Sequence, residues 1–134
     1  MKAKYFIAIV FLIITGCKKE TTNLSSDVQG TWELVSVDGG WSGHVEYDPG
    51  NGNTISFNGN IYHQKIKTGD STYQYSGTFV IYTDKPCDFA NEQTLIKFND
   101  SEPASSFSLS NGKLIIGATE CMADGSTLTY RKIE

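Results

Sequence analysis

The chain has 134 residues, of which 39% are hydrophobic and 12% aromatic, a composition typical of a globular protein with a packed core. It carries 15 acidic and 11 basic residues, so its formal net charge is −4. Because an acidic protein repels phosphate backbones and no basic patch is interleaved with aromatic residues, we expect no nucleic-acid partner.

The first sixteen residues have the layout of a secretion signal. Met1 to Lys4 bring two positive charges, and ten apolar residues follow from Tyr5 to Ile14. A run of this length is too short for a transmembrane helix, which needs about twenty residues. We therefore predict that residues 1–16 direct export and are removed.

The signal ends in Ile14-Thr15-Gly16-Cys17, which resembles the lipobox of bacterial lipoprotein precursors. The resemblance implies that Cys17 is acylated and becomes the first residue of the mature protein. An ordinary signal peptide with a chance cysteine is the alternative. Each buried methylene of an acyl chain stabilises membrane attachment by about 0.8 kcal/mol, so three chains would anchor the protein firmly. The expected location is the cell envelope, lipid-anchored to the outer membrane.

Residues 17–28 are predicted to form a flexible tether, because they are polar apart from a few side chains such as Leu24 and show no periodicity. The start Cys17-Lys18-Lys19-Glu20 resembles the charged signals that carry some lipoproteins to the outer surface of Gram-negative bacteria. A short charged run is also typical of a solvated spacer. The periplasmic face and the cell surface both stay open as locations.

Removal of residues 1–16 leaves 118 residues with a net charge of −6, because Lys2 and Lys4 are lost. One domain is expected at this size. Cys87 and Cys121 remain as an even pair, which favours a disulfide in an exported protein. The bridge would close a loop of about 35 residues, worth about 3 to 4 kcal/mol in the chain-entropy model. Two free buried thiols are the alternative, and no histidine lies near either cysteine in sequence to suggest zinc.

Short runs of period-two alternation, separated by Gly, Asn and Asp clusters, predict an all-β domain over residues 29–134. The eight expected strands are Thr31–Val37, Asn53–Asn58, Ile61–Lys67, Thr72–Thr83, Thr94–Asn99, Ser106–Ser110, Lys113–Ala118 and Ser126–Ile133. The segments Asn58–Asn60 and Ser110–Lys113 are tight-hairpin signals, because Asn-Gly accepts the positive φ of primed turns. Sequential hairpins of this kind indicate a meander.

Each expected strand has one apolar face, as Trp32 and Leu34 show on the first strand and Tyr73, Tyr75 and Phe79 on the fourth. An antiparallel up-and-down β-barrel of about eight strands buries all these faces and removes the exposed edges of an open sheet. A two-sheet sandwich is the alternative.

The first and last strands resemble those of lipocalins. Gly30-Thr31-Trp32 and Arg131 match the lipocalin-like pattern of a first-strand tryptophan beneath an arginine of the closing strand. The stretches GTWELVSVDGGWSG and CMADGSTLTYRKI are similar to short lipocalin-like lipoproteins of Gram-negative bacteria. The resemblance implies a cation–π contact between Arg131 and Trp32, worth about 0.5 to 2 kcal/mol. The sequence departs from that of full lipocalins in being shorter, and we expect no equivalent of their C-terminal helix after Glu134.

The expected disulfide conflicts with the expected barrel. If all eight strands span the barrel, Cys87 follows the fourth and Cys121 the seventh, so three crossings place them at opposite ends. Strands of six residues are about 20 Å long, whereas a disulfide needs Cα atoms within about 7 Å. Either the bridge is absent or the strand count is wrong, and the irregular stretch of residues 84–105 points to the count.

The long connection Asp38–Gly52 is the main candidate for a binding loop, because it is aromatic and would partly cover the mouth of a lipocalin-like barrel. The expected ligand contacts, for a small apolar or amphipathic molecule, are Trp41, His44, Tyr47, Tyr73, Tyr75 and Phe79. In the alternative, Trp41 and Tyr47 plug a solid barrel, and the protein has an envelope-structural or protein-interaction role.

We expect no enzymatic activity, cofactor or metal. His63 lies on the polar side of its strand beside Lys65, and no catalytic or phosphate-binding motif is present. The oxygen side chains of Asp48, Asn51 and Asn53 have roughly the spacing of a calcium loop but lack the closing glutamate, so a polar turn is the simpler interpretation.

Overall fold

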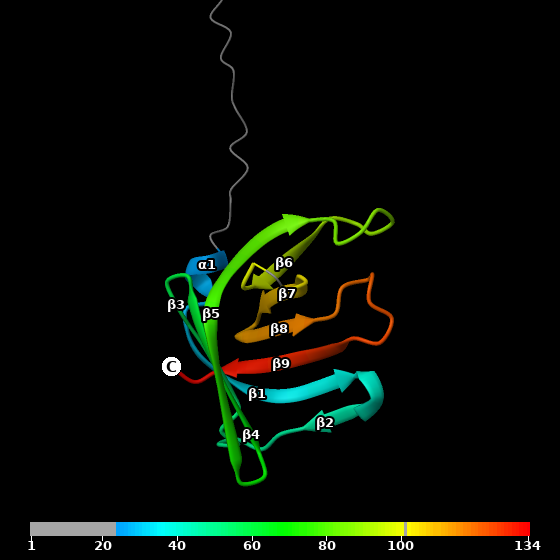
Figure 1. The fold of residues 1–134 in the computed structure, drawn as a ribbon. Coiled ribbons are helices and arrows are strands. Elements are labelled where there is room, and N and C mark those ends of the chain that lie inside the picture. Colours follow the sequence, from blue (N-terminus) through cyan, green and yellow to red (C-terminus); the bar gives the residue numbers. More distant parts are fainter. Residues whose placement is uncertain (1–23, 101) are drawn as a thin grey trace, which may run out of the picture.

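The computed structural model describes residues 24–100 and 102–134 (Figure 1). The predicted signal peptide, the lipidation site Cys17 and the start of the tether lie outside the described residues. A short helix α1 (Leu24–Asp27) and a 3-10 turn η1 (Gly40–Ser42) accompany nine strands. These strands are β1 (Gly30–Gly39), β2 (His44–Glu46), β3 (Thr54–Asn58), β4 (Ile61–Thr68), β5 (Ser71–Asp84), β6 (Gln93–Phe98), β7 (Ser105–Ser110), β8 (Lys113–Gly117) and β9 (Ser126–Lys132).

Eight of the strands close an antiparallel up-and-down barrel. The strands from β3 to β9 follow one another around the sheet, and β1 pairs with both β3 and β9. This arrangement confirms the predicted fold class. The ninth strand, β2, was not predicted and pairs with the second half of β1, where Ser36 faces Glu46 and Asp38 faces His44.

The tight hairpins form where the sequence predicts them. Asn111 and Gly112, between β7 and β8, have φ values of 52° and 70°, the left-handed pair of a primed turn. Asparagine tolerates this conformation better than other side chains, and glycine adopts it without a steric cost.

One end of the barrel is densely packed with aromatic residues, and we call it the packed end. Trp32, Phe57 and Phe79 are buried there, and the rings of Phe57 and Phe79 meet edge to face with centroids 4.8 Å apart. Tyr62 and Phe98 form a second edge-to-face pair at 4.7 Å. Such pairs contribute about 0.5 to 1.5 kcal/mol beyond the area that they bury.

Helix α1 covers the packed end. Val28, directly after the helix, is fully buried, and its carbonyl accepts a hydrogen bond of 2.7 Å from Trp32 Nε1. The Gln29 side chain joins this segment to the β3–β4 turn, because its amide donates to Gly59 O and its oxygen accepts from Gly59 N. Residues 24–28 were predicted to belong to the flexible tether. The structure instead makes them part of the folded domain.

The cation over Trp32 is Lys132 and not Arg131. The Lys132 Nζ atom lies 5.5 Å from the Trp32 ring centroid. Register explains the correction: Trp32 faces Lys132 across β1 and β9, whereas Glu33 faces Arg131. Arg131 instead forms an ion pair with the buried carboxylate of Glu33, which also accepts a 2.9 Å hydrogen bond from Gly50 N. The Arg131 guanidinium beside Glu33 holds the pKa of that carboxyl below its usual value.

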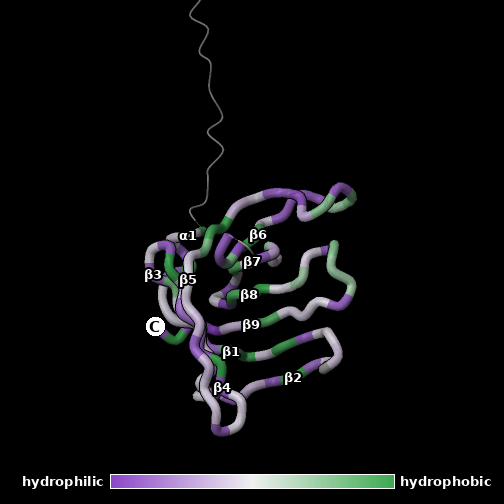
Figure 2. The backbone as a smooth tube through the Cα atoms, viewed as in Figure 1, coloured by the Kyte–Doolittle hydropathy of each residue, from purple (hydrophilic) through white to green (hydrophobic). Residues whose placement is uncertain are grey.

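Strand β5 bends midway and changes partner. Residues 71–78 pair with β4, and residues 79–84 pair with β6. At the bend the Asn99 side chain lies so close to Gly77 that a Cβ atom there would be 2.0 Å from Asn99 Oδ1. Asn99 N also donates to Thr78 O at 2.8 Å. Figure 2 shows the change in hydropathy: β5 is pale to purple beside β4, and a short green segment follows the bend before the strand turns purple again at its end.

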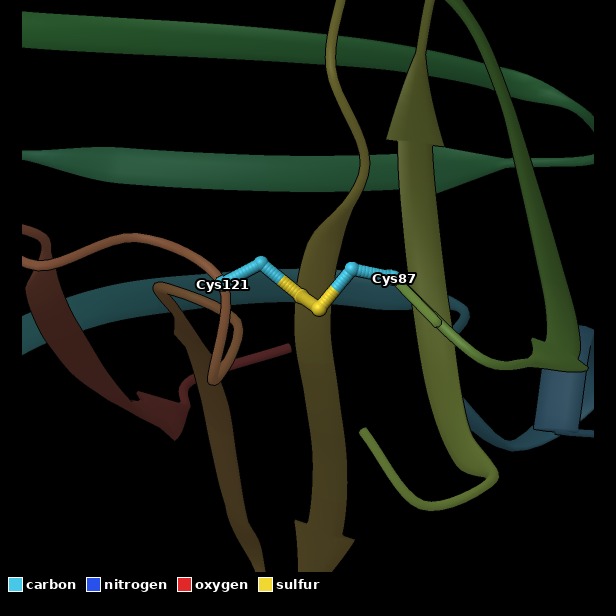
Figure 3. Close-up of a disulfide and its surroundings, with 2 residues drawn as sticks. All are labelled: Cys87 and Cys121. Carbon is cyan, nitrogen blue, oxygen red and sulfur yellow. A yellow bond between two sulfur atoms is a disulfide. The ribbon is translucent and has the colours of Figure 1, made fainter. Parts of the chain in front are cut away.

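The predicted disulfide forms, with Cα atoms of Cys87 and Cys121 6.2 Å apart (Figure 3). The bridge and the eight-strand barrel are both present, so the apparent conflict came from assuming that every strand spans the barrel. Strands β6 and β7 share only two residue pairs and are strongly offset along their length. Stagger of this kind is the shear that barrel closure requires.

The offset brings the two cysteine-bearing connections level. A single row of facing residues crosses β5, β6, β7 and β8 at Tyr82, Leu95, Ser106 and Gly117. Tyr82 lies two residues before the end of β5, and Gly117 is the last residue of β8. The chain therefore leaves both strands near the same height, within reach of a disulfide.

Candidate functional site

The interior beyond the packed end is not filled. A hollow of about 400 Å³, which we call the main hollow, lies between β3, β4 and β5 on one side and β7, β8 and β9 on the other. Its lining is mainly apolar and includes the side chains of Ile55, Ile66, Phe98, Ile116 and Leu128. A volume of this size is in the range of small-molecule sites.

The mouth of the main hollow lies where the barrel wall is incomplete. Residues 71–77 of β5 pair with β4 on one edge, and no described strand pairs with their other edge. Tyr75 on this part of β5 and Glu102 before β7 both line the hollow. The Tyr75 side chain is 52% exposed, so it can contact both an interior ligand and solvent.

A few polar groups are placed inside the apolar lining. Tyr130 on β9 is buried, and burial raises the pKa of its phenol to about 12, with a hydrogen bond from Gln64 acting in the opposite direction. The phenol is therefore neutral at ordinary pH and can donate a hydrogen bond to a ligand. Ser105 at the start of β7 adds a hydroxyl to the same lining. Such sparse polar groups in an apolar site orient a ligand.

A smaller side hollow of about 210 Å³ adjoins the main hollow. The two share Gln64, Ile66, Leu128 and Tyr130, and the side hollow extends to Tyr47 and Val37 near β2. Gln64 and Tyr130 line both spaces, so the polar side chains of the site lie where the two hollows adjoin.

The structure brings together only part of the predicted ligand site. Tyr75 lines the main hollow, and Tyr47 lines the side hollow. Phe79 is buried at the packed end against Phe57 instead of lining either hollow. Trp41 is 101% exposed, which also excludes it as a plug of the barrel. The remaining two predicted contacts, His44 and Tyr73, are exposed, and neither belongs to the lining of the two hollows described above.

Gln64 and Tyr130 line the main hollow but were not predicted as ligand contacts, although the sequence indicates that both side chains point inward. Gln64 alternates in step with Tyr62 and Ile66, so it shares their inward face. Tyr130 alternates in step with Leu128 on β9. Period-two alternation thus places both side chains inside the barrel, where a polar group marks a position that can contact a ligand.

The His44 side chain on β2 contacts a carboxylate of the neighbouring strand β1. Its ring contacts the Asp38 carboxylate through Nδ1 and lies 3.4 Å from Glu46 Oε1 through Nε2. Asp38 and Glu46 together raise the pKa of the His44 ring, and His44 lowers the pKa of Asp38. Ser36 Oγ donates to the same aspartate at 3.2 Å. The order of contact is serine, aspartate, histidine, so the histidine does not touch the serine that it would have to activate in a nucleophilic triad.

The polar turn before β3 uses its side chains for structure. Asn51 Nδ2 donates to Leu34 O at 2.9 Å, and Asn51 Oδ1 accepts from Asn53 N at 2.8 Å. Asn53 Oδ1 in turn accepts from Lys67 N at 2.7 Å, so the turn ties β1 to β4. These contacts support the interpretation as a turn. Among residues 24–100 and 102–134, no group of three His, Cys, Asp or Glu side chains is arranged to hold a metal ion.

Comparison with known proteins finds no family model that matches the chain, and no curated protein or solved structure that matches it. In the part of the chain that the structure describes, none of the helices has the length and apolar character needed to cross a membrane.

Proposed function

We propose that this protein is an exported, lipid-anchored envelope protein with a lipocalin-like barrel that binds a small apolar or amphipathic molecule without catalysis. The single observation that carries this proposal is the main hollow. It is open to solvent beside Tyr75, apolar over most of its lining, and large enough at about 400 Å³ for a drug-sized ligand.

The polar groups of the hollow support an amphipathic ligand over a purely apolar one. Gln64 and Tyr130 lie inside, so a ligand hydroxyl or carbonyl could hydrogen-bond there while its apolar part contacts Ile55 and Ile116. A purely apolar ligand would contact only the aliphatic part of this lining and would give Gln64 and Tyr130 no hydrogen-bonding partner.

Two observations support export and anchoring. The Cys87–Cys121 disulfide is typical of an oxidising compartment outside the cytoplasm. The lipobox-like Ile14–Cys17 supplies the proposed acylation site at Cys17. Outer-membrane attachment follows from the lipoprotein resemblance alone. Mass spectrometry of the purified protein should find an N-terminal acylated Cys17, and a mature protein that begins at another residue or carries no fatty acid would refute the anchor.

The ligand is tested by extraction from protein purified from its native host. We expect mass spectrometry of the extract to show one small amphipathic compound in near-stoichiometric amount. A variant with the hollow filled, Leu128→Trp, should lose it. The matched control is Val80→Trp on the outer face of β5, which adds the same ring outside the hollow and should keep the compound.

An empty extract needs a second measurement, because a ligand can be lost during purification. Wild-type protein should then bind an environment-sensitive apolar dye such as 1-anilinonaphthalene-8-sulfonate, and Leu128→Trp should reduce the binding about tenfold or more. Equal binding by Leu128→Trp, Val80→Trp and the wild type would refute a ligand site in the hollow.

A further inference from the structure

The strongest unexplained feature of the molecule is a set of apolar side chains exposed at one end of the barrel. Trp41 on η1 is 101% exposed, Phe89 in the β5–β6 connection is 80% exposed, and Met122 in the β8–β9 connection is 46% exposed. None of the three lines the main or the side hollow. Exposed large apolar groups that the core does not use mark interaction sites when they gather on one surface.

The three segments that carry these side chains are linked through the β8–β9 connection. The disulfide joins the β5–β6 connection to the β8–β9 connection. The end of β1 and the start of η1 lie beside the point where this connection enters β9, because a Cβ atom on Gly39 would be 3.0 Å from Gly125 O and one on Gly40 would be 2.8 Å from Ser126 Oγ. We call this surface, residues 38–46, 84–92 and 118–125, the loop rim; Figure 1 shows it at the right of the barrel.

The loop rim carries nearly all of the net charge of the described chain. Its seven acidic residues are Asp38, Glu46, Asp84, Asp88, Glu92, Glu120 and Asp124, and its basic residues are Lys85 and the titratable His44. The other described residues hold seven acidic and six basic side chains, which nearly cancel. Of the rim carboxylates, only Asp38 and Glu46 are in ion pairs within the described part of the chain.

We infer that the loop rim docks a basic polypeptide surface that offers apolar pockets for Trp41 and Phe89. Unpaired carboxylates around two protruding aromatic rings are complementary to lysine and arginine around a hydrophobic depression. The aromatic rings would be the energetic anchors, and the carboxylates would steer the encounter. This inference is independent of the small-molecule ligand, because it uses no residue of either hollow.

A membrane surface fits the loop rim less well than a basic protein does. Anionic lipid headgroups would be repelled by the rim carboxylates. The rim also lies at the far end of β1 from α1, about 30 Å away for its ten residues. The rim is therefore remote from the end of the domain at which the proposed tether would join it.

The test measures binding of synthetic dodecapeptides to the full-length protein in phosphatidylcholine nanodiscs, with quenching of tryptophan by acrylamide as the signal. Trp32 is buried at 1% exposure, so changes in quenching report on Trp41. An alternating Lys/Leu peptide should protect Trp41 from acrylamide. The matched Lys/Ser peptide should bind about tenfold more weakly for want of apolar anchors, and the Glu/Leu peptide should not bind.

Double variants test whether the peptide binds at the loop rim. Because Trp41 is replaced in one of them, binding is followed by the fluorescence anisotropy of a labelled peptide. Trp41→Ser with Phe89→Ser should weaken Lys/Leu binding about tenfold or more, as loss of anchoring aromatic residues does. Ile61→Ser with Tyr73→Ser, at exposed positions off the rim, is the control and should change it less than about twofold. Asp88→Asn with Asp124→Asn should reduce binding and its salt dependence, whereas Asp27→Asn with Asp70→Asn should not.

Three results would overturn the inference. The first is equal loss of affinity in the rim variants and their controls. The second is binding of the Glu/Leu peptide as strong as that of the Lys/Leu peptide. The third is capture of phosphatidylcholine vesicles that depends on Trp41 and Phe89, which would assign the rim to a lipid surface. Circular dichroism melting of each variant separates loss of binding from loss of fold.

Discussion

The two ends of the barrel interior are built from the same strands but filled differently. At the packed end, Phe57 and Phe79 interlock while Val28 and helix α1 close the opening. In the main hollow, the inward positions of those strands hold side chains such as Ile55, Gln64 and Leu128, which leave about 400 Å³ open. Closure of the hydrogen-bonded sheet thus fixes the outline of the barrel but not how much of the interior is filled, which depends on side-chain volume at each inward position.

The largest expected effect falls at the packed end. Phe57→Ala should lower the free energy of unfolding by about 3 to 5 kcal/mol, because it removes a buried ring from a tight aromatic cluster. Urea denaturation followed by fluorescence, in a Trp41→Phe background that isolates Trp32, measures the loss. A loss below about 1 kcal/mol would mean that this end is no better packed than the hollow.

The disulfide should rank next. Replacing both Cys87 and Cys121 with serine should cost about 3 to 4 kcal/mol, because the bridge closes a loop with a sequence separation of 34 residues. The same denaturation experiment on wild-type protein in reducing agent is the control and should give an equal loss. Unchanged stability in both would show that the staggered strands hold the rim connections without the bridge.

A truncation in the main hollow should cost less than one at the packed end. Leu128→Ala should lower stability by less than about 2 kcal/mol, since Leu128 is only partly buried and already borders empty space. Compared with Phe57→Ala in the same urea titration, this variant sharpens the contrast between the two regions. If Leu128→Ala and Phe57→Ala lost the same unfolding free energy per buried methylene, the hollow would be as well packed as the packed end.

The smallest expected effect is the pH dependence of β2. Since the pKa of His44 is raised in the folded chain, the stabilisation from its protonated ring is present below the unfolded value of 6.5 and is lost as the pH rises through the folded value. A proton NMR titration should find the raised value in wild-type protein. Asp38→Asn should move it back toward 6.5, and no change in that variant would exclude Asp38 as the main cause.

Local sequence signals predicted most of the fold. Alternation and the Asn-Gly turns were sufficient for the barrel and its hairpins, because both depend on neighbouring residues. The three-residue strand His44–Glu46 was too short to show alternation. The stagger between β6 and β7 could not be predicted, because register depends on how distant strands pair and no local pattern encodes it.

The candidate site was predicted less well, for physical reasons that differ from residue to residue. Tyr75 lines the hollow as its parity indicates, but Phe79 lies past the bend that Gly77 allows and so joins the packed end. Trp41 is fully exposed in a turn whose glycines at positions 39, 40 and 43 all have positive φ. The direction of a loop side chain depends on such backbone conformations, which aromatic content alone does not reveal.

Closure of the barrel depends on the two most distant parts of the folded chain. Glu33 and Arg131 meet across the β1–β9 seam although they are 98 residues apart in sequence, and Thr31 N bonds to Glu134 O at 3.0 Å. During synthesis the first strand therefore emerges long before β9, and although β2 and β3 can already pair with it, its β9-facing edge must stay unpaired until the last strand is made. Folding should be slow for a chain of this size, because its decisive contact has a high contact order. The unpaired edge of β1 would be the segment most open to wrong strand pairing during that interval.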